Sequence, residues 1–524
     1  MFFLPAVSDD SSDLVLSAGD IVAAAGCEYG AMRSLDVLLG RVEARASEPD
    51  EMLELVSAMG AAHEAAVLEK LRPKGVHELA HTGSLTRGTL TARHAETLSA
   101  LAGGHGVVYQ ASFFDGTFHG RADFLVREPD GTWSVNDTKL SRTPKDAALL
   151  QLAAYADQLE EAGVPVHPEV RLILGTGETT RHSLAEILPR YRGARNRLEA
   201  LASEHRDEEE PAAWGDARWS VCLHCAPCKE AIEANDDLML VRLMNTSRRS
   251  RLIAMGISTM TAFARADLPK ADNFLRTLQE QAKLQTGTAA TDGEVNGTSY
   301  QVLPGNTLGL LPAPSAGDIF FDFEGDPLYQ DSTADWGLEY LFGLLEHEPA
   351  GATTEATGDA GEGTVFTGYT AHDRAQEKTA LIDFITHVQD RRARFPDLHV
   401  YHYASYEVTA LRRLAARHGV MAAEVEELVE AGVLFDLFVT VKTSLRISER
   451  SLSIKKLEPL YMPAARTGTA TAVDSITAYS KYRAAALTGD TAAAAALFED
   501  IRAYNEYDCL STLRLRDWLL TLPQ

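Results

Sequence analysis

The sequence contains few cysteines and no long apolar run. Five cysteines in 524 residues are too few for a disulfide scaffold. No stretch of 18 consecutive apolar residues occurs, which excludes an ordinary membrane-spanning helix. The apolar residues at the N-terminus lack the basic head of a secretory signal. We therefore expect a cytoplasmic protein that has no membrane partner.

Basic residues are also scarce, with 49 Lys and Arg against 75 Asp and Glu and a formal net charge of −26. This balance disfavours tight, non-specific DNA binding, because phosphate contacts need clustered Lys and Arg. It does not exclude an enzyme that holds nucleic acid in a local groove, since carboxylates that bind Mg²⁺ add to the negative total. The sequence has no Gly-x4-Gly-Lys-Ser/Thr motif, so a phosphate loop for ATP is not expected.

Length and patterning predict a multidomain α/β protein. At about 150 residues per domain, the chain corresponds to three or four domain-sized units. We expect an α/β domain over 1–235, a helical connector over 236–285, a linker over 286–315 and a second α/β domain over 316–524. The linker is expected because its first half is rich in Thr, Gly and Ala.

Two neighbouring predicted strands of the first domain carry a group of charged residues. Asp123 lies on the first strand, and Asp137 and Lys139 lie two positions apart on the next, so they project from one face. Pairing of the strands would bring Asp123 alongside. Two carboxylates and a lysine at one point suit the binding of Mg²⁺ or Mn²⁺ and the activation of an attacking water.

Three further side chains accompany this group. His63 interrupts the apolar face of a predicted helix, and Gln151 and Tyr155 lie one turn apart on another. A histidine on an apolar face is more often a core residue than a ligand. In this order, however, the set resembles the PD-(D/E)XK nuclease superfamily, specifically its RecB-like branch. The resemblance implies a restriction-endonuclease-like fold in which all six residues serve catalysis and His63, Asp123 and Asp137 bind the metal.

Four of the five cysteines have the spacing of metal ligands. Cys222, Cys225 and Cys228 form two consecutive Cys-x2-Cys steps, and Cys27 supplies a fourth ligand if the ends of the domain meet. The set resembles RecB-like nucleases in which one early and three late cysteines clamp the domain around a [4Fe-4S] cluster. The resemblance implies such a cluster here, although the late triplet is tighter than usual. Zn²⁺ is the alternative, because four thiolates suit both metals.

The second α/β domain carries acidic residues in three separate motifs. Asp322 and Glu324 alternate with apolar residues on a predicted strand and share one face. Glu407 follows at a predicted strand-to-helix junction, and Tyr504 and Asp508 lie one turn apart on a predicted helix near the end of the sequence. Carboxylates arranged in this way suit a pair of divalent metal ions.

This order resembles the DEDD exonucleases of the ribonuclease H-like fold, closest to the YprB-type branch. The resemblance implies that Asp322, Glu324, Glu407 and Asp508 bind two metal ions while Tyr504 orients the attacking water. The second motif departs from the usual pattern because it has a glutamate in place of the shorter aspartate, which alters the expected metal spacing.

Together the resemblances imply a metal-dependent nuclease of DNA repair or processing that acts on single strands or ends. Similar bacterial RecB-family proteins are of a helicase–nuclease type, and because this sequence lacks the helicase, a separate helicase is an expected partner. In the connector, Arg248–Arg251 and Met255-Gly-Ile-Ser resemble a helix-hairpin-helix DNA contact, with a plain helical spacer as the alternative. Two other functions stay open: a nucleic-acid-binding adaptor with inactive nuclease folds, and an RNA exonuclease.

Overall fold

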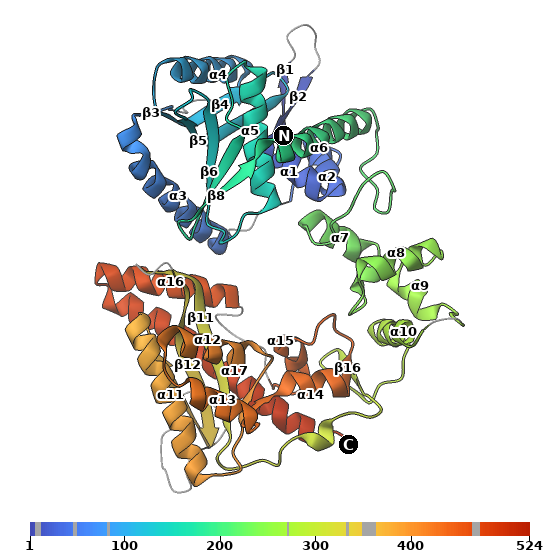
Figure 1. The fold of residues 1–524 in the computed structure, drawn as a ribbon. Helices are drawn as coiled ribbons and strands as arrows, with labels where there is room; N and C mark the ends of the chain where they lie inside the picture. Colours follow the sequence, from blue (N-terminus) through green and yellow to red (C-terminus); the bar gives the residue numbers. More distant parts are fainter. Residues whose placement is uncertain are drawn as a thin grey trace. The chain divides into compact units, whose positions relative to one another are not determined.

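The computed structural model describes residues 1–5, 12–45, 50–80, 84–269, 272–331, 335–347, 363–463 and 472–523. These residues form two compact units, Met1–Asn235 and Asp236–Gln524. Both units combine helices with sheets (Figure 1), which confirms the predicted α/β class. Within the described part of the chain, no helix is long and apolar enough to cross a membrane.

The first unit is built around a mixed eight-stranded sheet. Its strands are β1 (Phe2–Pro5), β2 (Ser12–Ser17), β3 (Val76–Glu78), β4 (Val107–Phe114), β5 (Phe118–Arg127), β6 (Trp133–Lys139), β7 (Glu169–Leu174) and β8 (Thr179–Ser183). At its centre, β5 pairs antiparallel with β4 and β6, and β6 pairs parallel with β7. Every residue of β6 except Lys139 is buried, as is typical of a strand covered on both faces.

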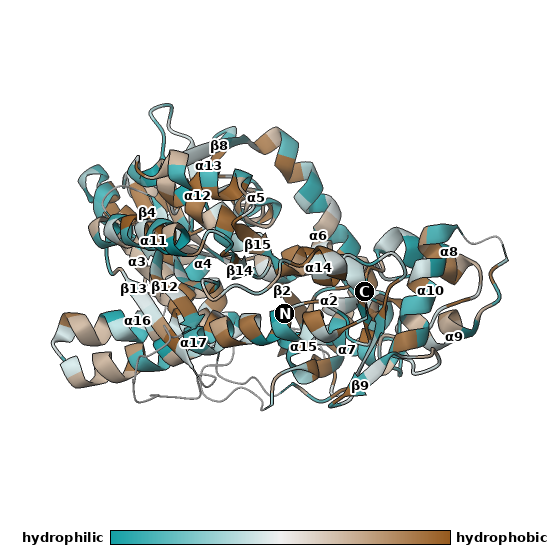
Figure 2. Cartoon of the chain, turned by 90° about the horizontal axis from the view of Figure 1, so that it is seen from below, coloured by the Kyte–Doolittle hydropathy of each residue, from teal (hydrophilic) through white to brown (hydrophobic). Residues whose placement is uncertain are grey.

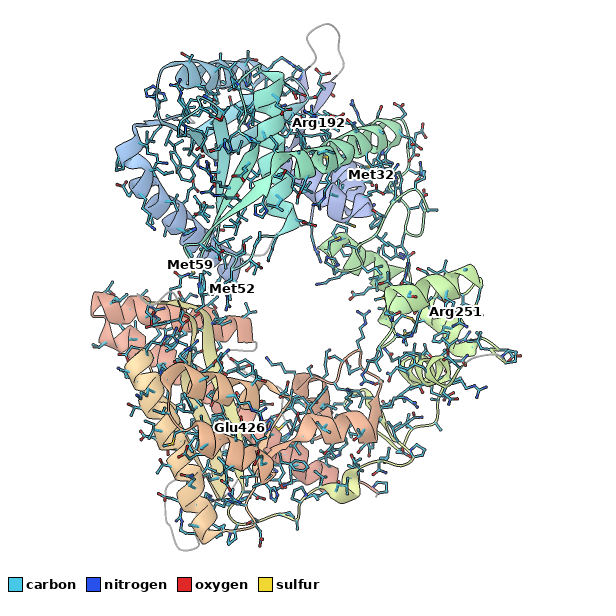
Figure 3. The ribbon with its side chains drawn as sticks, in the orientation of Figure 1. Met32, Met52, Met59, Arg192, Arg251 and Glu426 are labelled. Atoms are coloured by element: carbon cyan, nitrogen blue, oxygen red, sulfur yellow. The ribbon has the colours of Figure 1, made fainter. Side chains whose placement is uncertain are left out.

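Helices cover this sheet. They are α1 (Ala18–Gly26), α2 (Glu28–Leu38), α3 (Glu51–Leu71), α4 (Arg87–Ala102), α5 (Asp146–Glu161), α6 (Leu184–Arg206) and α7 (Ala226–Ala234). Helix α5 is buried along most of its length and packs on β6 and β7. Helix α3 begins at the cap Asp50, whose carboxylate accepts from the N–H of Leu53. Its N-terminal half is more open, since Met52 and Met59 (Figure 3) are only half-buried.

The second unit contains a five-stranded sheet of order β13-β12-β11-β14-β15. Its strands are β11 (Ile319–Gln330), β12 (Trp336–His347), β13 (Thr364–Thr370), β14 (Val400–His402) and β15 (Leu434–Asp436). Strand β12 pairs antiparallel with both β13 and β11, and β14 and β15 run parallel to β11. Because side chains alternate along β11, Phe321 and Phe323 enter one core while Phe320 enters the core on the opposite face.

Helices lie on both faces of this sheet. They are α11 (Arg374–Arg394), α12 (Tyr406–His418), α13 (Ala422–Glu430), α14 (Leu437–Ser444), α15 (Ile454–Leu457), α16 (Ala472–Thr488) and α17 (Thr491–Thr521). Residues of α11, α12 and α13 share the core of Phe321, and residues of α14 and α17 share the core of Phe320.

A buried ion pair joins α17 to Asp318, the residue that directly precedes β11. The Arg516 guanidinium donates to Asp318 Oδ2 at 2.7 Å, and both side chains are almost fully buried. The same guanidinium lies 4.9 Å from the ring centroid of Phe320 and 5.1 Å from that of Tyr401. Removal of either charged partner would leave an unpaired buried charge, so this contact strongly favours one alignment of α17 along the sheet.

The connector is helical, with α8 (Thr246–Ala254), α9 (Met260–Arg265) and α10 (Asn273–Gln285) around a core of their own. The turn between α8 and α9 contains Gly256 at φ +82°. Helix α10 is attached to the rest of the unit because Gln281 Nε2 donates to the carbonyl oxygen of Ile447 at 2.8 Å.

The structure differs from the expected linker over 286–315. This segment contains β9 (Gly293–Val295) and β10 (Thr298–Val302), which pair with each other and with β16 (Leu445–Ile447). The two strands are joined by Asn296 and Gly297, both at positive φ, as a tight hairpin turn requires. The Asn-Gly step was the signal for a hairpin, and the many small residues around it concealed the strands.

Candidate metal centres and active sites

The carboxylates of Asp123 and Asp137 meet on neighbouring strands of the first unit. The register of β5 and β6, with Phe124 opposite Asn136, sets these two residues across from each other. The N–H of Thr138 donates to Asp123 Oδ2 at 3.3 Å, and Lys139 Nζ lies 2.5 Å from Asp137 Oδ2. The structure thus brings together the two carboxylates and the lysine that the sequence singles out.

The electrostatics of this pair favour a cation. Burial and the neighbouring charge of Asp137 raise the pKa of Asp123 to about 7, although Lys139 acts in the opposite direction. Asp137 is buried and Asp123 is half-buried, and neighbouring carboxylates in such surroundings repel each other when both are ionised. A divalent cation would relieve the repulsion, and hard carboxylate oxygens are the ligands that Mg²⁺ and Mn²⁺ prefer. The donor set therefore fits the expected metal.

Helix α3 crosses the strands that carry the acidic pair. His63 Nε2 donates to the carbonyl oxygen of Ile173 on β7 at 3.3 Å, while Glu64 Oε1 accepts from the Tyr109 hydroxyl on β4 at 2.8 Å. Strands β5 and β6 lie between β4 and β7, so α3 spans the acidic pair. His63 does not belong to any cluster of three or more potential ligands among the described residues, if the ligand atoms of a cluster must lie within 4.8 Å of one another. Its role as a ligand stays a prediction.

Helix α5 supplies the other side of this site. Tyr155 is buried, and its pKa is raised by burial and by the negative charges of Asp137 and Asp123. A Cβ on Gly120 of β5 would lie 2.7 Å from Tyr155 Cε1, so glycine at this position makes room for the ring. Gln151 is half-buried one turn earlier on the same helix.

Polar residues that no sequence motif marked hold α3 in place. Glu64 follows His63 directly and also accepts a hydrogen bond from Gln110. Gln110 has φ +60°, a conformation that a residue with a side chain rarely adopts. Such strain is retained where surrounding contacts require it, and no sequence pattern marked Gln110 for it.

The four cysteines Cys27, Cys222, Cys225 and Cys228 converge, with one sulfur from each within 4.8 Å of the others. Cys27 Sγ lies 3.5 Å from Cys228 Sγ and 3.7 Å from Cys225 Sγ, and Cys222 Sγ lies 3.8 Å from Cys228 Sγ. The ends of the domain meet here because α2 packs against α7. The predicted four-cysteine cluster is confirmed.

The local backbone suits thiolates. Cys27 is the N-cap of α2, and its sulfur accepts from the N–H of Gly30 at 3.3 Å, where helix N–H groups favour negative charge. Cys225 is the N-cap of α7, and burial raises the pKa of its thiol to about 11. Burial raises the pKa of Cys222, but hydrogen bonds from the N–H groups of His224 and Cys225 outweigh this effect, and the pKa falls to about 6. Four sulfurs gathered at one point, from two buried and two half-buried cysteines, fit a metal centre.

The second unit brings Asp322, Glu324 and Asp508 together, with ligand atoms within 4.8 Å of one another. The two β11 residues share one face of the strand, and Asp508 reaches them from α17, which packs on β11. Burial and the charge of Asp508 raise the pKa of Glu324 to about 8, although Ser475 and Asn505 lower it. Three oxygen donors in mutual repulsion fit divalent metal ions.

Side chains that the sequence analysis missed orient these carboxylates. Asn505 Nδ2 donates to Asp322 Oδ2 at 2.8 Å, and the Ser475 hydroxyl donates to Glu324 Oε2 at 2.6 Å. Gly343 lies opposite Asp322 on β12, where a Cβ would be only 1.5 Å from Asn505 Oδ1. Asn505 follows Tyr504 directly, but nothing in its type or spacing distinguished it from other polar helix residues.

Glu407 lies outside the group of three carboxylates. It is buried at the start of α12, where its Oε2 is 3.3 Å from His402 Nδ1. Burial raises the pKa of Glu407, and the neighbouring His402 lowers it. Asp436 caps α14, and its Oδ1 accepts hydrogen bonds from the N–H groups of Phe438 and Ala404, at 2.9 and 2.8 Å. Its carboxylate therefore stabilises the local backbone. The metal-binding role of Glu407 stays a prediction.

Tyr504 lies beside the three carboxylates on α17. It is buried, and its hydroxyl accepts from Lys455 Nζ at 3.1 Å. The same ammonium lies 5.3 Å from the tyrosine ring centroid and lowers the pKa of Glu324 by its positive charge. Lys455 is thus a further residue of this site that the sequence analysis did not identify.

Comparison with known families agrees with this geometry. Residues 30–228 match the PD-(D/E)XK nuclease superfamily, and residues 319–520 match the RNase_H superfamily. No curated protein matches the chain. Both resemblances drawn from the sequence motifs are confirmed at the level of the superfamily. The two superfamily domains indicate a nuclease, and nuclease domains bind nucleic acid. The chain therefore carries a PD-(D/E)XK nuclease superfamily domain followed by an RNase H superfamily domain.

Proposed function

We propose that this protein is a divalent-metal-dependent nuclease that hydrolyses DNA, at single strands or ends, in repair or nucleic-acid processing. The convergence of Asp322, Glu324 and Asp508 from a strand and a distant helix carries the proposal. A cytoplasmic location and a separate helicase partner belong to the same proposal, through the resemblance to RecB-family helicase–nuclease proteins.

In the second unit, Asp322, Glu324 and Asp508 would hold Mg²⁺ or Mn²⁺, with Glu407 as the proposed fourth carboxylate. Bound divalent ions lower the pKa of a water and stabilise charge on the leaving oxygen. Asn505 and Ser475 keep the first two carboxylates in place through their hydrogen bonds.

Around the same carboxylates, Lys455 holds the Tyr504 hydroxyl by donating to it. We propose that Tyr504 orients the attacking water from this position.

In the first unit, Asp123 and Asp137 would hold the metal, with His63 as a proposed third ligand. The positive charge of Lys139, beside Asp137, would stabilise a hydroxide or the phosphate in the transition state. Tyr155 closes one side of the acidic pair, and we propose that it and Gln151 position the substrate. The two sites belong to separate compact units, so each is proposed to cleave without the other.

For the cysteine centre we propose a structural metal that staples α2 to α7. The resemblance to RecB-like nucleases favours a [4Fe-4S] cluster, in which each thiolate binds a different iron. Three of the sulfur pairs are 3.5 to 3.8 Å apart and all four sulfurs lie within 4.8 Å of one another, which is close to the spacing around a single ion. Four sulfurs about 2.3 Å from one Zn²⁺ lie about 3.8 Å apart. Purification without oxygen, with a visible spectrum and iron and zinc contents, decides between the two.

Cleavage of end-labelled oligonucleotides tests the function. Single-stranded DNA, duplex DNA and RNA are incubated in parallel with Mg²⁺, with Mn²⁺ and with a chelator. We expect DNA cleavage that depends on the metal. Cleavage should fall in Asp137→Ala, in Asp508→Ala or in each of them. If only one unit is active, removal of its carboxylate should reduce cleavage by about a hundredfold or more. Glu178→Ala and Glu430→Ala, which alter exposed carboxylates in the two units, are the matched controls.

The same assay separates the other candidates. Loss of cleavage only in Asp508→Ala assigns the activity to the second unit, and loss only in Asp137→Ala assigns it to the first. Preferred cleavage of RNA would overturn the DNA assignment. Binding of oligonucleotides without cleavage under any metal condition would contradict the nuclease proposal and favour an adaptor.

A further inference from the structure

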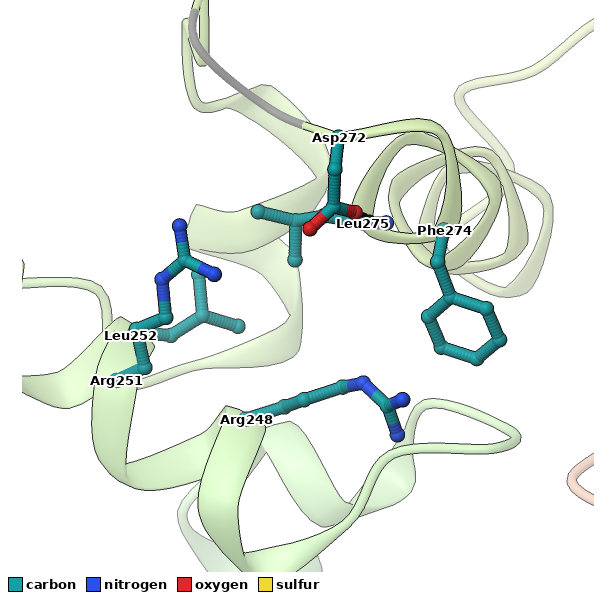
Figure 4. Close-up of a pocket in the computed structure, with 6 residues that line it drawn as sticks. All are labelled: Arg248, Arg251, Leu252, Asp272, Phe274 and Leu275. Carbon is teal, nitrogen blue, oxygen red and sulfur yellow. Dashed lines mark hydrogen bonds between the residues drawn. The ribbon is translucent and has the colours of Figure 1, made fainter.

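A pocket lies between α8 and α10 of the connector, and it belongs to neither acidic site. It encloses about 80 Å³ and is lined by Arg248, Arg251, Leu252, Asp272, Phe274 and Leu275 (Figure 4). In Figure 4 both arginines extend from α8; Arg251 lies away from Phe274, whereas Arg248 points toward the Phe274 ring. Leu252 and Leu275 are buried and form the apolar floor, so the pocket is part of the folded connector.

The three arginines of α8 have different surroundings. Arg249 is buried, and its guanidinium donates twice to Asp237 Oδ2 and once to Oδ1, so it is a structural ion pair. Arg248 and Arg251 are three positions apart and line the pocket on one helix face. In the described part of the chain, neither of these two forms an ion pair with a carboxylate. Arg251 is exposed on α8 (Figure 3).

Phe274 presents an aromatic ring to solvent at the rim of the pocket. Its side chain is 42% exposed, and the Arg248 guanidinium carbon lies 4.1 Å from its ring centroid. Asp272 is the one carboxylate of the lining, and its Oδ1 already accepts from the N–H of Leu275 at 2.8 Å as a helix cap. Figure 2 shows apolar and polar residues side by side on α8 and α10.

The local charge is opposite to that of the whole protein. Residues 236–285 contain eight Lys and Arg against five Asp and Glu, whereas the chain as a whole has a net charge of −26. An acidic protein that holds nucleic acid needs a local basic surface, because counterion release from phosphates drives that binding. An exposed aromatic ring beside arginines is the arrangement on which single-stranded bases stack.

We propose that the pocket between α8 and α10 binds single-stranded nucleic acid, with a base on Phe274 and the adjoining phosphates on Arg248 and Arg251. The inference rests on the proposed function, since it names where this nuclease holds its substrate away from the metal sites. Stacking requires no particular base, so the site holds any sequence, and it discriminates against duplex DNA, whose bases are already stacked.

Fluorescence anisotropy with labelled oligo-dT tests the proposal on the full chain, in chelator so that the probe is not cleaved. We expect Phe274→Ala to weaken binding about tenfold, the loss of one stacked base. Arg248→Ala with Arg251→Ala should reduce the slope of log affinity against log salt by about 1.4, since each phosphate contact contributes about 0.7. Arg276→Ala, an exposed arginine of α10 outside the pocket lining, should change neither quantity.

Phe274→Trp separates stacking from a loss of folding. It should keep the affinity of the natural chain, and oligo-dT should quench its added fluorescence. Unchanged affinity for oligo-dT in Phe274→Ala and in the double arginine variant would overturn the proposal, even if cleavage is normal. If the oligomeric state of those variants also changed, the surface around the pocket would be assigned to contacts between protein chains. Weakened binding in a chain that cleaves nothing supports the pocket while contradicting the nuclease function.

Discussion

Asn505 and Asp322 are 183 positions apart in the sequence, yet the amide of one holds the carboxylate of the other. At the scale of single residues, the charged groups of both acidic sites could be predicted from their spacing. The groups that orient them could not, because Asn505, Ser475 and Lys455 act through contacts that exist only after the chain has folded.

Gly343 permits the contact between Asn505 and Asp322. In Gly343→Ala the new methyl would overlap Asn505 Oδ1, so we expect the free energy of unfolding of the second unit to fall by about 1–3 kcal/mol. Cleavage by this unit should also fall, because Asp322 loses its orientation. Urea unfolding and single-strand cleavage measure the two effects.

A double variant provides the control for this prediction. In the Asn505→Ala background the overlapping side chain is absent, so Gly343→Ala should cost much less stability than in the natural chain. If Gly343→Ala lowers the free energy of unfolding equally in both backgrounds, the contact between Gly343 and Asn505 does not contribute to stability.

Asp115 makes a pH-dependent contribution to the first unit. Burial raises its pKa, but the N–H groups of Thr117 and Phe118 and the Arg195 guanidinium lower it more, so the pKa is below its ordinary value. A carboxyl whose pKa is lower when folded stabilises the protein above its unfolded pKa, and this stabilisation is lost as pH falls through the folded pKa.

We expect Asp115→Asn to lower the free energy of unfolding by about 1–3 kcal/mol at neutral pH. The difference from the natural chain should stay constant down to about pH 5 and shrink below about pH 4. Urea unfolding at several pH values measures it, with Glu178→Gln, an exposed carboxylate of the same unit, as the control. A difference that does not vary with pH would contradict the assigned role.

At the scale of helices and strands, α2 and α7 each carry at the N-terminus a cysteine of the four-cysteine cluster. Both helices are short, with 11 and 9 residues, and the proposed metal would join the two ends of the first unit through Cys27 and Cys225. Strand β5 could be predicted because apolar and polar residues alternate along its first half, from Phe118 to Phe124. The β9–β10 hairpin was not recognised, because small residues in the strands hide the alternation.

Cys225→Ser tests the dependence of α2 and α7 on the metal. We expect the variant to lose the bound metal and to melt several degrees below the natural chain, because metal-binding energy contributes to folding energy. Metal analysis and thermal unfolding measure both. A chelator strong enough to strip the natural chain should lower its melting temperature and leave that of the variant unchanged. An unchanged melting temperature and metal content in Cys225→Ser would contradict the four-cysteine centre.

At the scale of the whole molecule, the apolar cores divide between the two units. In the described residues, each core cluster draws all of its members either from Met1–Asn235 or from Asp236–Gln524. Each unit therefore has apolar cores of its own.

We expect residues 1–235 and 236–524 to fold when expressed separately. Each should unfold in one cooperative transition, and the first should retain the metal of the four cysteines. Calorimetry of the pieces and of the full chain provides the comparison. Aggregation of both pieces, or melting far below the full chain, would show that the units support each other.

The sequence by itself determined the α/β class, the two nuclease superfamilies and the identities of the charged and thiol groups, because these depend on residue type and on spacing within single strands and helices. Only the tertiary structure decided which of those groups meet. Asp508 joins Asp322 and Glu324, whereas Glu407 faces His402 and His63 bonds to a neighbouring strand. Distances between remote side chains follow from how helices pack on sheets, and that packing depends on contacts spread along the whole chain.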